Sequence, residues 1–136
     1  MRSGKNACRE EGSVNKVVYE PLIQLCDRLA EATHAGRVDW TAREDTAFVY
    51  QGASGAVEIR SRDRDGEAPF ELAIFNPDGG KVDVLVSAWS ADEEPAVWNE
   101  PLFDLYVAAR RRALGVDDII RDLLAELQTT VAASTK

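Results

Sequence analysis

The sequence predicts an α+β fold, a two-layer sandwich in which helices cover one face of an antiparallel sheet. Two observations support this. The spacing of apolar residues changes from a period near 3.6 to a period of 2 after Gly36, and the helical period returns from Trp98. Short, turn-rich connections separate the alternating segments, and connections this short join antiparallel neighbours. We expect one N-terminal and two C-terminal helices on a single sheet face, in one domain over residues 14–130.

The first helix is indicated by apolar residues that recur at helical spacing from Val14 onward. Its start has two readings. Either Ser13 is the N-cap and Pro21 kinks the helix, or Pro21 lies in the first turn, where its missing N–H costs nothing. Gly36 is expected to end the helix in a left-handed conformation. Residues 1–13 have no apolar stretch, so we expect a disordered tail and no secretory signal.

The central part of the chain alternates apolar and polar residues, as half-buried strands do. It predicts a meander of four strands, or five if residues 37–41 form a short one. The four are residues 47–50, 57–60, 70–75 and 82–87. Turn sequences join them at residues 52–55, 63–66 and 76–80.

The helical period returns in two stripes that Gly115 separates. Asp117 or Asp118 can cap the second helix at the positive end of its dipole. Residues 131–136 are small and polar and are expected to fray. The first stripe comprises Leu102, Leu105, Tyr106, Ala109 and Ala113, and the second comprises Val116, Ile119, Ile120, Leu123, Leu124 and Leu127.

The alternation assigns each strand residue to one of two sheet faces. The face under the helices is expected to carry Phe48, Tyr50, Val57, Ile59, Phe70, Leu72, Ile74, Val82, Val84 and Val86. The opposite face is expected to carry Gln51, Glu58, Arg60, Glu71, Asp83 and Ser87, together with Val49, Phe75 and Leu85. If Val49, Phe75 and Leu85 cluster, they form an apolar partner-binding patch; if scattered, they are ordinary surface residues.

Three tryptophans flank the predicted sheet. Trp40 follows the first helix by a short link and is expected to close the end of the core. Trp89 and Trp98 lie in a segment with Pro95, and aromatic residues anchor protein contacts. We therefore add Trp89 and Trp98 to the candidate partner-binding residues, with burial in the core as the alternative.

The sequence lacks the residue sets that known chemistries need, and we predict no catalytic, cofactor-binding or metal-binding residues. His34, the single histidine, lies at a helix C-terminus and is expected to cap carbonyls there. Residues 52–56 resemble a nucleophile elbow, but Ala56 replaces the final Gly and the context is strand to strand. Zinc sites need several close Cys or His, and the acidic run at residues 63–67 lacks the Gly and Glu of a calcium loop.

Charge and cysteine content narrow the partners and the compartment. The formal charge of −8 disfavours nucleic acid and anionic membranes, which attract clustered Lys and Arg. No apolar run approaches the length of a membrane span. Two cysteines, with Cys26 on an apolar helix stripe, favour a reducing cytoplasm.

Two segments resemble small bacterial proteins of unknown function. The first is residues 33–40, with the pattern Thr-x-x-Gly-x-[Ile/Val]-x-Trp. The second is residues 105–117, with the pattern Leu-Tyr-x-x-Ala-Arg-Arg-x-Ala-Leu-x-Val-Asp. The resemblance implies a helix–strands–helix arrangement and carries no activity, so no catalytic residue follows from it.

These observations favour a non-enzymatic protein that binds another protein, or itself as a homodimer, through the open sheet face. An inhibitor, an immunity factor or a chaperone-like accessory protein would suit its size and charge. One alternative is an enzyme or small-molecule binder, which would need a deep pocket with convergent polar groups. Another is an acidic mimic that binds nucleic-acid machinery, which would need carboxylates arrayed in rows.

Overall fold

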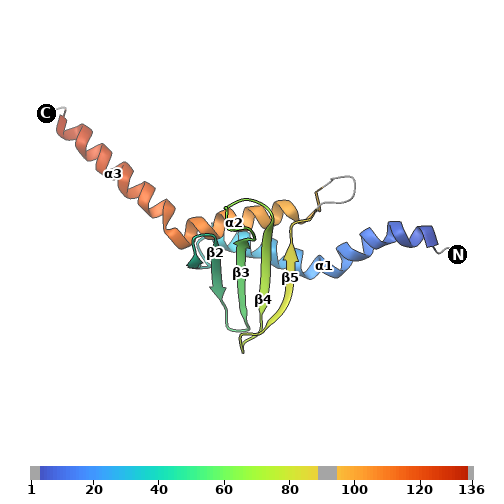
Figure 1. The fold of residues 1–136 in the computed structure, drawn as a ribbon. Helices are drawn as coiled ribbons and strands as arrows, with labels where there is room; N and C mark the ends of the chain where they lie inside the picture. Colours follow the sequence, from blue (N-terminus) through green and yellow to red (C-terminus); the bar gives the residue numbers. More distant parts are fainter. Residues whose placement is uncertain (1–3, 89–94, 135–136) are drawn as a thin grey trace.

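The computed structural model describes the backbone of residues 4–88 and 95–134, and the side chains of residues 19–88 and 95–129. It contains one open sheet and three helices, which confirms the α+β class (Figure 1). In chain order the elements are α1 (Gly4–His34), β1 (Thr41–Glu44), β2 (Ala47–Gln51), β3 (Ala56–Ser61), β4 (Phe70–Phe75), β5 (Lys81–Val86), α2 (Asn99–Leu114) and α3 (Val116–Ser134).

The sheet is a five-stranded antiparallel meander in the order β1-β2-β3-β4-β5. The fifth strand that the sequence left open exists, but it begins at Thr41, after Trp40, instead of spanning residues 37–41. One cross-strand row forms the centre of the core, and its four members are between 0 and 1% exposed. They are Phe48, Ile59, Leu72 and Leu85.

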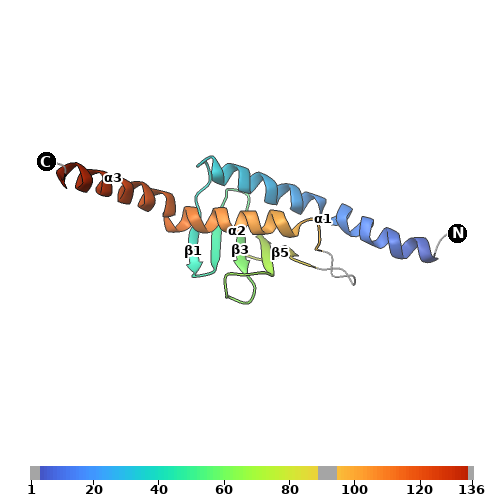
Figure 2. The same cartoon turned by 90° about the horizontal axis from the view of Figure 1, so that it is seen from above.

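Helices α1 and α2 lie on the same side of the sheet, and the other side has no described element over it (Figure 2). Helix α2 packs on β1 to β4, and α1 packs along α2. The helices complete the core with Leu22, Cys26 and Leu29 of α1 and Leu102, Leu105, Tyr106 and Ala109 of α2.

Strand β5 presents the face opposite to the one that the sequence predicts. Leu85 pairs with Leu72 in the core, so its assignment to the open face was wrong. Val84 pairs with Ala73 and therefore faces away from the helices, as does Val86. An irregularity shifts the register, because Ile74 pairs with Asp83 whereas the next residue, Phe75, pairs with Lys81. A shift of one residue exchanges the two faces of a strand.

Helix α1 is longer than predicted. It begins at Gly4, upstream of both Ser13 and Pro21, and so includes residues 4–13, which we expected to belong to a tail. Pro21 lies inside the helix, which excludes the interpretation that Pro21 is in the first turn. At the C-terminus, Gly36 has the expected left-handed φ of 77°. The N–H groups of Gly36 and Arg37 donate to the carbonyls of Thr33 and Ala32, so the backbone makes the cap that we expected of the His34 side chain.

Helix α3 departs from the two-layer plan. It follows α2 after a single residue, Gly115, whose φ of 64° ends α2 in the left-handed conformation. It then projects from the body on the side opposite to the start of α1, instead of covering the sheet (Figures 1 and 2). It continues to Ser134, beyond the position where we expected fraying.

Candidate protein-binding surfaces

The sheet face that α1 and α2 leave bare is the first candidate surface, and we name it the uncovered face. Figure 1 looks onto this side of the sheet. Its residues follow from the strand register and from the alternation of side chains along each strand. They are Thr41, Ala47, Val49, Gln51, Ala56, Glu58, Arg60, Glu71, Ala73, Phe75, Lys81, Val84 and Val86.

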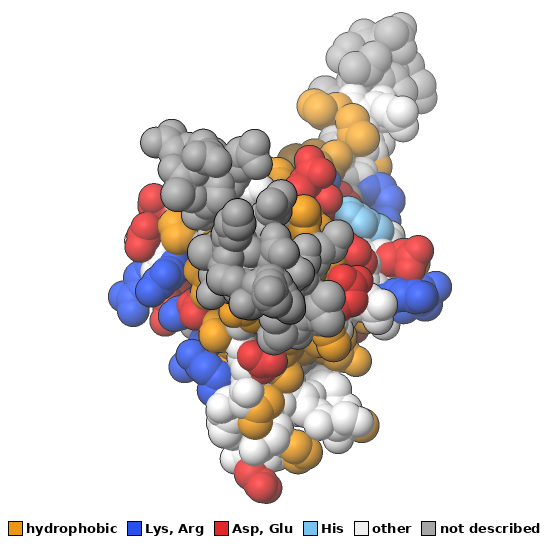
Figure 3. All heavy atoms as spheres, turned by 90° about the vertical axis from the view of Figure 1, so that its right-hand side faces the viewer, with side chains coloured by type: hydrophobic (Ala, Val, Ile, Leu, Met, Phe, Trp, Pro, Cys, Tyr) orange, Lys and Arg blue, Asp and Glu red, His pale blue; other side chains and the backbone are white. Residues whose placement is uncertain are grey.

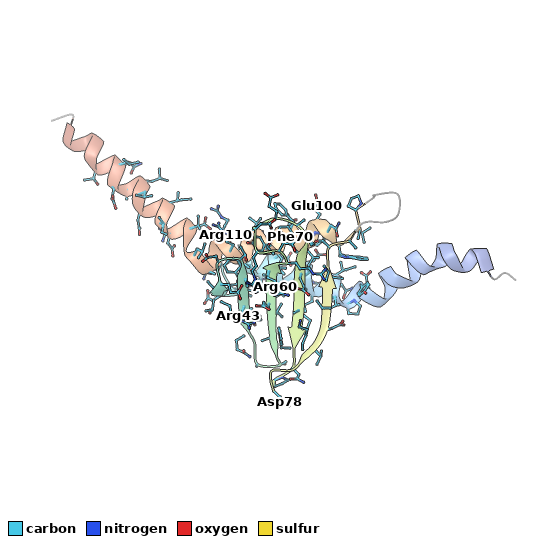
Figure 4. All side chains as sticks on the ribbon, in the orientation of Figure 1. Arg43, Arg60, Phe70, Asp78, Glu100 and Arg110 are labelled. Carbon is cyan, nitrogen blue, oxygen red and sulfur yellow. The ribbon has the colours of Figure 1, made fainter. Side chains whose placement is uncertain are left out.

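Two ion pairs occupy the middle of the uncovered face. Arg60 pairs across strands with Glu71: its Nε donates to Oε1 at 2.8 Å and its Nη2 lies 2.7 Å from the same oxygen. Arg43 of β1 reaches over the sheet, and its Nη1 donates to Oε2 of Glu58 at 3.1 Å. Figure 4 shows Arg43 and Arg60 on this side of the sheet. The hydrogen bond to Glu71 raises the pKa of Arg60, and the charges of Glu71, Glu58 and Glu44 add to this effect.

The carboxylates of both pairs are nearly covered although no described element lies over them. Glu58 is 6% exposed and Glu71 is 8% exposed, whereas the sequence indicated solvated side chains on this face. Their arginine partners cover them and neutralise their charge. The middle of the uncovered face therefore presents matched charges instead of a net acidic surface.

Aliphatic side chains surround the ion pairs. Val49 and Val84 lie in one cross-strand row, separated by Glu58 and Ala73, and Phe75 belongs to the neighbouring row. The side chains of Val49, Phe75 and Val84 are each half-buried. The apolar residues of this face are thus distributed around Ala73, and the patch of Val49, Phe75 and Leu85 expected from the sequence does not form.

The predicted tryptophan contacts have different outcomes. Trp98 is half-buried. Its indole N–H donates to the carbonyl of Val86 at 2.8 Å, and its ring packs at a tilt against Tyr19, with the ring centroids 5.2 Å apart. Trp98 therefore fastens the start of α2 to the end of β5. Trp89 lies outside the described residues. Asn99 strengthens the same junction, because its amide bonds both the N–H and the carbonyl of Ala88.

The motif at residues 33–40 has a structural explanation. Trp40 is 5% exposed and closes the core as expected, and its indole N–H donates to the hydroxyl of Thr33 at 2.9 Å. The Thr33 hydroxyl donates in turn to the carbonyl of Leu29 at 2.6 Å. Gly36 supplies the reversal between them. The Thr, Gly and Trp of the motif therefore fasten the end of α1 to the start of the sheet.

His34 borders a small hollow at the junction of the three helices. The hollow has a volume of about 120 Å³ and is also lined by Thr33, Arg111, Arg112 and Asp117. The other polar groups have partners: Arg111 pairs with Asp117, Arg112 lies 2.8 Å from Asp39, and the Thr33 hydroxyl bonds Leu29 and Trp40. Among these lining residues no nucleophile is aligned with the imidazole, so the geometry offers no catalytic pair.

A second hollow lies beside α2, on the side of the loop between β3 and β4. It has a volume of about 390 Å³ and is partly open to solvent, with Gly66, Phe103, Tyr106, Val107, Arg110 and Arg111 around it. Glu100 and Arg110 lie near the two ends of α2 in Figure 4. A small molecule in this hollow would stay partly exposed to solvent, unlike one in an enclosed binding site.

Cys26 is confirmed as a core residue. Its side chain is fully buried, and its thiol donates to the carbonyl of Pro101 at 3.2 Å. Burial, assisted by the charges of Asp27 and Asp104, raises the pKa of the thiol to about 12. Cys26 is therefore protonated at neutral pH and unsuited to nucleophilic chemistry.

The second candidate surface is the apolar side of α3, which we name the α3 stripe. Its five residues are Ile119 (54% exposed), Ile120 (44%), Leu123 (50%), Leu124 (57%) and Leu127 (61%). They fall within roughly 140° of the helix circumference at 100° per residue. Figure 3 shows hydrophobic side chains on α3 where it projects behind the body.

Sequence reasoning identified α3 as amphipathic but did not find the α3 stripe as an exposed surface. The sequence carries no signal for this exposure, because an amphipathic period does not specify what covers the apolar side of a helix. Val84 and Val86 were also missed on the uncovered face, because the alternation in β5 was assigned to the wrong phase.

Within the part of the chain that the structure describes, no group of three or more His, Cys, Asp or Glu residues is arranged to hold a metal ion. No described helix combines the length and apolar character that crossing a membrane requires. Comparisons with protein-family models, with curated proteins and with solved structures found no match.

Proposed function

We propose that this chain is a non-enzymatic, protein-binding module whose partner docks on the uncovered face. The observation that carries the proposal is a solvent-facing sheet surface whose charges are already matched. Docking removes water from charged groups, and this is costly when a buried charge has no partner. The Arg60–Glu71 and Arg43–Glu58 pairs lower that cost, while the surrounding valines and Phe75 supply apolar contact area.

The competing functions lack an equivalent feature. The described hollows either are open or have their polar groups engaged, which disfavours an enzyme or a small-molecule binder. An acidic mimic would present unpaired carboxylates in rows, whereas those of the uncovered face are paired with arginine. A regulatory or accessory role through protein contact is the function that this geometry favours.

A pair of valine variants tests the proposal. Val84→Lys places a charge beside Ala73 on the uncovered face, and Val107→Lys places the same charge at a half-buried position of α2, on the other side of the sheet. We expect immobilised wild type and Val107→Lys to capture the same partner from source-cell extract. The affinity of Val84→Lys for that partner should be lower by a factor of roughly thirty, which corresponds to about 2 kcal/mol, as for a substitution at an interface hot spot.

The control is the thermal unfolding midpoint, which should be similar for both variants because neither side chain lies in the core. Equal capture by Val84→Lys and wild type would contradict the proposal, as would a wild-type protein that captures nothing specific.

A further inference from the structure

The α3 stripe is the largest structural feature that the uncovered face does not explain. Its five large aliphatic residues are between 44 and 61% exposed, whereas the apolar residues of α2 that face the sheet are buried. They expose about 500 Å² of accessible apolar surface on one helix, which is near the upper end for a soluble monomer and is typical of functional patches.

A helix that projects from the body of the protein also needs an interaction that stabilises it. Helices of fewer than about 12–15 residues are marginal in water, and longer ones gain most of their stability from packing an apolar face. Helix α3 has 19 residues, and among its described side chains an ion pair with the body lies at its beginning, where Asp117 pairs with Arg111 of α2. The stripe from Ile119 to Leu127 requires a covering surface.

We propose that a second copy of this chain covers the α3 stripe, and that the two α3 helices pack antiparallel in a homodimer. The spacing fits helix pairing, because Ile120, Leu123 and Leu127 follow each other at intervals of three and four residues. Pairing two stripes buries at most about 1,000 Å² of apolar surface, and the flanking polar groups bring this toward the roughly 1,200 Å² at the lower end of specific interfaces.

The charges on α3 favour this occupant over a lipid surface. Between Val116 and Thr129 the helix carries four acidic residues, Asp117, Asp118, Asp122 and Glu126, against the single basic residue Arg121. Helices that bind membrane surfaces carry Lys and Arg on their polar face, so an anionic membrane would repel this one.

The helix dipoles favour the antiparallel orientation. In a parallel pair the two dipoles would align and their like ends would lie level with each other, which is unfavourable. In an antiparallel pair each acidic first turn lies beside the C-terminal half of the other helix, and the helix dipoles oppose each other favourably. Beyond its attachment to α2, α3 projects away from the body, which leaves the α3 stripe accessible for this arrangement (Figure 2).

The mass of the full-length protein in solution tests the dimer. Light scattering after size-exclusion chromatography should give twice the chain mass of 15.0 kDa. Leu123→Glu places a charge in the middle of the stripe and should give the single mass. Ala125→Glu, on the opposite side of the same helix, should stay dimeric. A monomeric wild type, or a Leu123→Glu variant that remains dimeric, would overturn the proposal.

Cross-linking tests the orientation. Asp117 and Gln128 lie on the same edge of α3, near its two ends. In a Cys8→Ser background, Asp117→Cys and Gln128→Cys should form a disulfide with each other when the two variants are mixed and oxidised, and little with themselves. Efficient cross-linking of each variant alone would overturn the antiparallel arrangement. Loss of partner capture by the Val84→Lys variant is a separate measurement, so either proposal can fail without the other.

Discussion

Thr33 joins the end of α1 to Trp40 through one hydroxyl group. It accepts a hydrogen bond from the indole of Trp40 and donates one to the carbonyl of Leu29, and its side chain is buried. A buried indole N–H without a partner is costly, because its hydrogen bond to water is lost without replacement. Thr33 therefore stabilises the fold by accepting the hydrogen bond of the Trp40 indole N–H.

Replacing Thr33 with Val retains the shape and removes the hydroxyl. We expect Thr33→Val to lower the free energy of unfolding by about 1–3 kcal/mol, the cost of leaving a buried donor unsatisfied. Urea unfolding of this variant measures the loss. Thr41→Val, at an exposed position of β1, is the matched control and should change the stability by less than about 0.5 kcal/mol. Equal effects would show that the Trp40 hydrogen bond is not needed.

Cys26 makes stability depend on pH in the alkaline range. Its pKa is raised from 9.0 to about 12 in the folded protein, so the unfolded chain releases the proton first. The contribution is fully present below pH 9.0 and is lost as the pH rises toward 12. We expect the difference in unfolding free energy between wild type and Cys26→Ala to be constant below pH 9.0 and to shrink above it. A constant difference throughout would contradict the raised pKa.

At the scale of single elements, β5 shows what residue patterns determine and what they leave open. The alternation of Val82, Val84 and Val86 predicts a strand correctly. Both phases of that alternation place apolar residues under the helices: Val82, Val84 and Val86 in one phase, and Leu85 in the other. The structure selects Leu85, and Ser87 beside it is satisfied by hydrogen bonds to the backbone of Phe70. These interactions are between strands, so no pattern within β5 reveals them.

Substitutions along β5 test this register. Leu85→Ala should destabilise the protein by about 2–5 kcal/mol, because it leaves a cavity in the core beside Leu72. Val84→Ala removes a half-buried side chain from the uncovered face and should cost less than about 1.5 kcal/mol. Chemical denaturation of the two variants measures both values. The reverse order would restore the phase that the sequence indicated.

At the scale of the whole molecule, the sequence predicts the fold class and the strand order, but not which surfaces a partner covers. The change of period after Gly36, the turn sequences and the return of helical spacing predict the α+β class and the meander. They also predict that α3 is amphipathic, but the period of a helix does not specify what covers it. The uncovered face is similar, since Glu58 and Glu71 look solvated in sequence and become covered only when Arg43 and Arg60 cross from other positions.

The single-residue junction at Gly115 has a consequence for valency. It allows little movement between the globular body and α3, which is about 30 Å long at 1.5 Å per residue. Two α3 helices paired antiparallel would hold the two globular bodies at opposite ends of a short, stiff spacer. A target that displays repeated copies of one epitope at matching intervals would then be bound at two places, with an avidity well above the affinity of either globular body.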